Sequence, residues 1–146
     1  MAYIDQFFEV LINAGASDLH LGEHQPPKIR RHGEMVPIRN EVLTHDEMAY
    51  LMSEICGADR WERYNETGDL DFAYEMDEHS RFRCNFLKQS NGYGCVFRLI
   101  PTKIASLDQL GIPQIVKEFG HLRGGLVLVT GPTGSGKSTT LAALLD

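Results

Sequence analysis

The sequence is poor in cysteine and has no long apolar run. Its three cysteines form no Cys-x-x-Cys pair, which argues against a disulfide framework or a cysteine-ligated zinc site. We expect Cys56, Cys84 and Cys95 to be reduced thiols in a core. No apolar segment approaches the roughly 18 residues of a membrane span. The first residues also have neither the basic start nor the apolar centre of a signal peptide. We therefore expect a cytoplasmic protein without membrane insertion.

There is no excess of basic charge either. The chain has 14 Lys and Arg against 20 Asp and Glu, which gives a formal net charge of -6. This balance argues against a surface that coats nucleic acid, so we expect no nucleic-acid partner. It leaves a nucleotide site open, because such sites use local donors. With 146 residues and 42% hydrophobic residues, the chain can hold one domain and part of a second.

Three segments carry helical signals, and a glycine ends each of them. In the second segment, Thr44-x-x-Glu47 forms a capping box. We expect Trp61 and Tyr64 in the third segment to be core or interface residues rather than a platform for a base. The segments run over 3–14, from Thr44 to Gly57, and around Trp61 to Gly68.

Six further runs alternate or are β-branched and predict strands: 18–21, 28–32, 35–38, 69–76, 81–88 and 93–100. Asn91-Gly92 predicts a type I′ turn between the last two, which would place Asn85 opposite Arg98. One face of this hairpin is apolar and indicates the core. Arginines share its other face: Arg81, Arg83 and Arg98.

The most specific motif lies near the end of the chain. Residues 126–130 form a continuous apolar run that predicts a strand covered on both faces. Residues 131–138, Gly-Pro-Thr-Gly-Ser-Gly-Lys-Ser, then fit the P-loop pattern G-x-x-x-x-G-K-[ST], and a helix is expected over 138–145. Glycines let the backbone turn its N–H groups toward phosphate oxygens, and the helix N-terminus adds a positive end. The motif therefore predicts a site for the phosphates of ATP.

The pattern also predicts individual roles. Lys137 should reach the β- and γ-phosphates, and the Ser138 hydroxyl should bind Mg²⁺. Because Ser138 already supplies a metal position, we interpret the acidic strand 69–75 as a solvated face. Asp18 forms no clear carboxylate–His ligand pattern with the nearby histidines, so we interpret it as structural. The residues expected to hold ATP are Gly131, Pro132, Thr133, Gly134, Ser135, Gly136, Lys137, Ser138 and Thr139.

A P-loop alone does not hydrolyse ATP efficiently. It needs an acidic Walker-B residue on a later strand and a group that orients water. Neither follows Asp146. We therefore expect this chain to be the N-terminal portion of a longer enzyme, a P-loop ATPase, and residues 1–146 to be inactive alone.

Several blocks of the sequence resemble the secretion and type IV pilus ATPases. They are residues 15–21, 68–72, 81–85, 97–101, and 125–130 followed by the P-loop. The resemblance covers nearly the whole chain, and the short N-terminus resembles the retraction type within the family. It is weaker at Cys84 and over 75–80.

The resemblance implies an α+β fold class. Residues 1–100 would form a PAS-like N-terminal domain with an antiparallel sheet. Residues 101–146 would form a linker, then the first strand and the P-loop helix of a RecA-like α/β ATPase domain. The family's ATP sites lie between the two domains. Arg83 and Arg98 match the arginines that reach the triphosphate, so with Lys137 they are the expected catalytic residues.

The resemblance also implies a homo-hexameric motor that powers type IV pilus retraction and twitching motility. It would lie at the cytoplasmic side of the inner membrane, against the platform components of the pilus. Two alternatives remain: a pilus assembly or type II secretion ATPase, and a regulatory module that binds ATP without turnover. The arginines likewise have an alternative role, in a solvated face or in ion pairs with Asp69 and Asp71.

Overall fold

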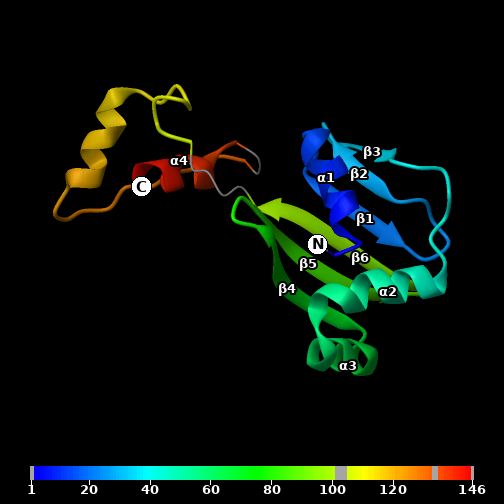
Figure 1. The fold of residues 1–146 in the computed structure, drawn as a ribbon. Coiled ribbons are helices and arrows are strands. Elements are labelled where there is room, and N and C mark those ends of the chain that lie inside the picture. Colours follow the sequence, from blue (N-terminus) through cyan, green and yellow to red (C-terminus); the bar gives the residue numbers. More distant parts are fainter. Residues whose placement is uncertain (1, 101–104, 133–134, 146) are drawn as a thin grey trace. The chain divides into compact units, whose positions relative to one another are not determined.

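The computed structural model describes residues 2–100, 105–132 and 135–145. Thr133 and Gly134 of the predicted P-loop lie outside these described residues. The chain divides into two compact units, residues 1–100 and 101–146. In Figure 1 the first unit runs from blue to green and the second from yellow to red.

The N-terminal unit is built on a six-stranded sheet in the order β3-β2-β1-β6-β5-β4 (Figure 1). All neighbouring strands are antiparallel. The strands are β1 (Asp18–Gly22), β2 (Lys28–Arg31), β3 (Glu34–Pro37), β4 (Asp69–Asp77), β5 (Ser80–Gln89) and β6 (Gly92–Ile100). The sheet and its helices confirm the predicted α+β class.

Three helices accompany this sheet: α1 (Asp5–Asn13), α2 (His45–Cys56) and α3 (Ala58–Thr67). The predicted capping box is present, because the backbone N–H of Glu47 donates to the Thr44 hydroxyl and the Glu47 side chain accepts from the Thr44 N–H. Helix α1 packs on β1, α2 on β6 and β4, and α3 on β4.

The core lies on the sheet face predicted to be apolar. Phe8 of α1 stacks on Phe82 at 4.0 Å between ring centroids and meets Phe97 edge-on. Tyr64 is buried and donates its hydroxyl hydrogen to the Leu87 carbonyl, so it belongs to the core as predicted. All three cysteines are free and buried, as expected.

The predicted turn between β5 and β6 is wrong by one position. Gln89 pairs with Gly92, so Ser90 and Asn91 form the turn, and neither has the positive φ of a type I′ turn. Gly92 instead has φ +115°, and a Cβ there would lie 2.0 Å from a Glu23 carboxylate oxygen. Glu23 also accepts from the Tyr93 N–H, 2.9 Å away, which fixes this register.

The register shift does not change which residues lie on the apolar face and which on the polar face. Each residue's partner moves by two positions along the other strand, and side chains two apart lie on the same face. The shift does change the partners, however. Arg83, rather than Asn85, lies directly opposite Arg98.

The C-terminal unit contains a 3₁₀ helix, η1 (Gln114–His121), and helix α4 (Lys137–Leu145). The predicted strand over 126–130 is not formed: this run has no regular structure and is exposed. A strand is held by hydrogen bonds to a neighbour, and no described residue of this unit belongs to a strand. No helix within the described ranges has the length and apolarity needed to cross a bilayer.

Candidate functional site

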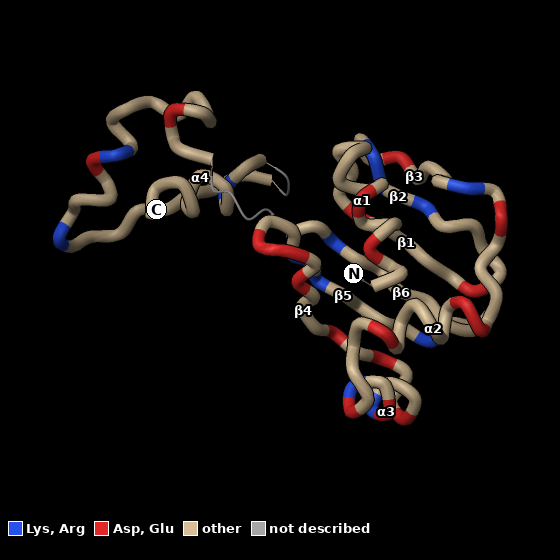
Figure 2. Tube along the Cα trace, viewed as in Figure 1, with Lys and Arg blue, Asp and Glu red and all other residues tan. Residues whose placement is uncertain are grey.

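Charged side chains form a row across the polar face of the sheet, the face opposite the Phe82 and Phe97 core. The strand registers place Arg30 opposite Asp18, Asp18 opposite Arg98, and Arg98 opposite Arg83. Figure 2 shows basic positions on β5 and acidic positions along β4. Like charges that face one another directly destabilise a sheet. The Arg83 and Arg98 pair therefore needs carboxylates beside it.

Arg98 is held by a buried carboxylate. Its Nε donates to Oδ1 of Asp18 at 2.8 Å, and the Asp18 side chain is only 5% exposed. The other oxygen of Asp18 accepts from the Ser17 hydroxyl at 2.7 Å, and Arg30 Nε lies 3.7 Å from it. Burial opposes ionisation of Asp18, but the hydrogen bonds from Ser17 and Arg98 outweigh it and keep its pKa below the ordinary value.

Arg83 is paired with a carboxylate on the surface. Its Nε and Nη2 both donate to Asp71, and the shortest distance is 2.6 Å. The side chains of Arg83 and Asp71 are 64% and 42% exposed. Hydrogen bonds from Arg83 hold the pKa of Asp71 below its ordinary value. Of the two acidic partners proposed from the sequence, the structure selects Asp71.

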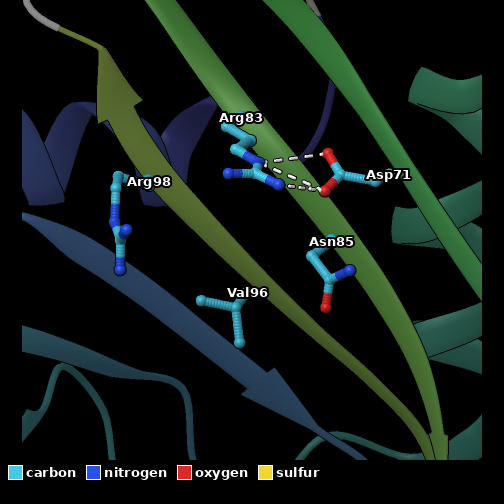
Figure 3. A pocket seen from close by; sticks show the side chains of 5 residues that line it. All are labelled: Asp71, Arg83, Asn85, Val96 and Arg98. Carbon is cyan, nitrogen blue, oxygen red and sulfur yellow. Dashed lines mark hydrogen bonds and ion pairs between the residues drawn. The ribbon is translucent and has the colours of Figure 1, made fainter.

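The two arginines flank an open hollow of about 300 Å³ (Figure 3). Asp71, Asn85 and Val96 complete its lining. A guanidinium offers five N–H donors in a planar fork that matches phosphate and carboxylate oxygens. The hollow therefore presents two such forks, from neighbouring strands, to an anion of phosphate size.

The C-terminal unit carries the residues of the P-loop pattern. Gly131 has φ +151°, and a Cβ there would lie 2.7 Å from Ser135 Oγ, so only glycine fits without a shift. Lys137 Nζ donates to the Pro132 carbonyl at 2.7 Å and so lies over its own loop. Thr140 donates its backbone N–H to the Gly136 carbonyl as α4 begins.

These residues fit the phosphates of ATP and a magnesium ion. Gly131 and Gly136 have positive φ, the Lys137 ammonium lies at the loop, and the exposed Ser138 side chain lies in the first turn of α4. Lys137 would contact the β- and γ-phosphates, and Ser138 would bind Mg²⁺.

The remaining acidic candidates are held by ion pairs or exposed. Glu75 pairs with Arg81 at 3.5 Å. The described residues hold no cluster of three side chains suited to a metal ion. Sequence reasoning missed that Asp18 anchors Arg98, because 80 residues separate the two and only the pairing of β1 with β6 brings them together.

Asp18→Asn is expected to destabilise the N-terminal unit by about 2 kcal/mol, the usual worth of hydrogen bonds to a charged group. Because the folded pKa of Asp18 is lowered, its contribution is complete above the ordinary pKa of 3.8 and is lost as the pH falls through the folded pKa. Thermal unfolding followed by circular dichroism at pH 7 and below pH 4 measures this.

Asp69→Asn is the control, since it removes the same charge from an exposed position on the sheet. The difference between wild type and Asp18→Asn should shrink in acid. A constant difference across that range would show that ionised Asp18 is not the source.

A profile of the family described as type II/IV secretion system protein matches residues 1–146. The chain is 44% identical over 132 residues to the type IV pilus retraction ATPase PilT of Pseudomonas aeruginosa, covering 90% of this chain and 38% of that protein. It is 38% identical over 120 residues to a twitching motility protein of Neisseria gonorrhoeae, covering 82% of this chain and 32% of that protein.

Solved structures give the same result. The crystal structure of the pilus retraction motor PilT with bound ADP aligns with a TM-score of 0.85 at 32% identity, over 100% of this chain and 43% of that one. The ATPase DotB of Legionella pneumophila aligns with a TM-score of 0.82 at 27% identity, over 98% of this chain and 41% of that one. The chain thus spans about two fifths or less of these relatives. The resemblance found in the sequence blocks is confirmed.

Proposed function

The chain belongs to the family of type II/IV secretion system proteins, and from this premise we propose that it is the ATP-binding N-terminal part of a motor ATPase that powers type IV pilus retraction. The observation that carries the proposal is that a chain similar to PilT carries both the P-loop pattern and the facing arginines Arg83 and Arg98, which are called the arginine row below. "Full-length protein" below means this chain together with the remainder that its relatives carry.

The chemistry assigned to this chain is the binding and charge stabilisation of ATP. The backbone N–H groups of the P-loop, to which Pro132 contributes none, would surround the phosphates, and Lys137 would neutralise the β- and γ-phosphates. Bound Mg²⁺ would further neutralise the charge that builds up on the phosphates. Arg83 and Arg98 are the donors for the γ-phosphate as water attacks it and its bond to the leaving ADP oxygen breaks. The Walker-B acid and the group that orients water belong to the remainder.

The assembly is part of the proposal. We place six copies in a ring at the cytoplasmic side of the inner membrane, against the platform of the pilus. Hydrolysis would move the two domains relative to each other and so act on the pilus base. The names of the relatives, a pilus retraction ATPase and a twitching motility protein, support this assignment.

Deletion of the gene in its own organism tests the function. Loss of a retraction motor should abolish twitching while pili stay on the cell surface or accumulate there. Loss of surface pili would instead indicate an assembly ATPase, and loss of secretion with normal twitching would indicate a secretion ATPase. Purified full-length protein should release phosphate from ATP, with residues 1–146 alone as the blank. Binding without turnover by the full-length protein would identify a regulatory module.

A further inference from the structure

The two arginines of the row are held in different ways, and the difference has a functional consequence. We propose that Asp71 is a positioning residue that holds Arg83 in a parked state, in which Asp71 occupies its Nε and Nη2, and that a phosphate binding along this edge must displace Asp71. Arg98, in contrast, is fixed by Asp18 and binds phosphate without leaving its partner. This inference rests on the proposed function, in which both arginines contact the triphosphate.

Arg98 can serve two partners at once. Arg98 contacts Asp18 through Nε, and within the described residues its two terminal nitrogens have no hydrogen-bond or ion-pair partner. The two terminal nitrogens point away from this bond and remain donors for a phosphate. Asp18 itself is buried and is also held by Ser17 and Arg30. A phosphate therefore meets an arginine that is already oriented, at no cost in broken ion pairs.

Arg83 is more restricted, because Asp71 takes one edge of its guanidinium and leaves only Nη1 and one N–H of Nη2 outside that contact. Its Nε and Nη2 both contact the Asp71 carboxylate, which occupies one full edge of the guanidinium fork (Figure 3). A phosphate that is to bind two nitrogens along that edge must displace Asp71. Both side chains are largely exposed, and exposed ion pairs are weak. The pair is therefore easy to break, which suits a contact that forms and breaks in each catalytic cycle.

The position of Asp71 supports competition rather than a structural role. It lies opposite Asn85 on β4, which is one of the two edge strands of the sheet. Its described hydrogen bonds and ion pairs go to Arg83. It also lines the same hollow as the two arginines, so its carboxylate competes with the phosphate for one site.

The test is Asp71→Asn in the full-length protein, with binding of a non-hydrolysable ATP analogue measured by calorimetry. Release of Arg83 should lower Kd by about two- to fivefold, the range set by the strength of an exposed ion pair. KM for ATP should fall with it, while kcat should not. The control is Asp69→Asn, two residues away on the same face; the Asp69 carboxylate makes no hydrogen bond or ion pair within the described residues. It should leave Kd unchanged.

A double-mutant cycle shows whether the effect passes through Arg83. In an Arg83→Ala background, Asp71→Asn should no longer change Kd. An equal gain in that background would mean that Asp71 acts by general charge, and it would overturn the inference. So would weaker binding, or a lowered melting temperature, in Asp71→Asn alone.

These failures are distinct from failure of the proposed function. If Arg83→Ala lowers turnover and Asp71→Asn leaves Kd unchanged, the arginine acts in catalysis but is not parked. If neither variant changes Kd, KM or kcat, the phosphate role of Arg83 is itself wrong.

Discussion

ATP turnover by the full-length protein should fall by about 10³-fold, to background, when Lys137 is replaced by alanine. In the proposed ATP complex the ammonium would lie as a point charge against the β- and γ-phosphates, and loss of one preorganised donor to a developing charge costs about 10²- to 10³-fold. Binding of the phosphates weakens as well, so both kcat and ATP affinity should drop. The N-terminal unit should stay folded, because the described contact of Lys137 Nζ is with Pro132 in its own loop.

Phosphate release and circular dichroism together measure this effect. Lys117→Ala is the matched control: it removes a lysine from the same unit, where its partner is the exposed Asp108. Control and wild type should have the same rate. Retained turnover with a normal KM in Lys137→Ala would contradict the P-loop assignment. Loss of the dichroism signal would indicate a folding role for this lysine.

Replacing Arg83 or Arg98 by alanine should reduce kcat by as much as about 10³-fold, the lower end for arginines that stabilise a phosphoryl transition state. ATP affinity should change much less than kcat, and least in Arg83→Ala. For Arg83 the reason is the parked state: gaining the phosphate costs the bond to Asp71, so the net contribution to ground-state binding is small. Lysine should restore little activity at either position, because an ammonium does not reproduce the planar fork.

The steady-state rates of these variants need a control on the same face. Arg81 provides it, since it is exposed and pairs with Glu75 outside the lining of the hollow. Arg81→Ala should keep most of the activity. An equal loss of kcat in Arg81→Ala, Arg83→Ala and Arg98→Ala would mean that the polar face of the sheet affects turnover through its total charge. Arg83 and Arg98 would then have no specific role.

Mixed rings test whether the arginines act on a nucleotide held by another subunit. Arg83→Ala subunits and Lys137→Ala subunits should each be inactive alone. If ATP sites are shared between neighbours, some interfaces in a mixed ring combine an intact P-loop with an intact Arg83, and activity should partly return. No recovery in rings shown to be mixed would place both residues in the same subunit.

Local patterns in the sequence predicted most of the N-terminal unit. Capping at Thr44 and Glu47, together with glycines at the helix ends, set the helices. Strict alternation separated the arginine face of the last hairpin from its core face. These features depend on residues only a few positions apart in the sequence, so they can be predicted before the fold is known.

The features that were predicted wrongly or missed depend on contacts between residues far apart in the sequence. The turn between β5 and β6 was misplaced because Glu23, some 70 residues away, approaches Gly92 and selects the register. The pairing of Asp18 with Arg98 depends on β1 lying beside β6. The strand expected over 126–130 was predicted from its apolar, β-branched residues, but a strand also requires a partner strand.

We propose that, in the full-length protein, Arg83 and Arg98 contact the ATP that residues 131–138 bind. The most direct test is a structure of the full-length protein with Mg²⁺ and a non-hydrolysable ATP analogue. We expect residues 131–138 around the phosphates, Ser138 on the metal, and nitrogens of Arg83 and Arg98 about 3 Å from oxygens of the γ-phosphate. In that structure Arg83 should have left Asp71 while Arg98 still contacts Asp18. Nucleotide bound at the P-loop with the arginine row facing solvent in every subunit would contradict the account.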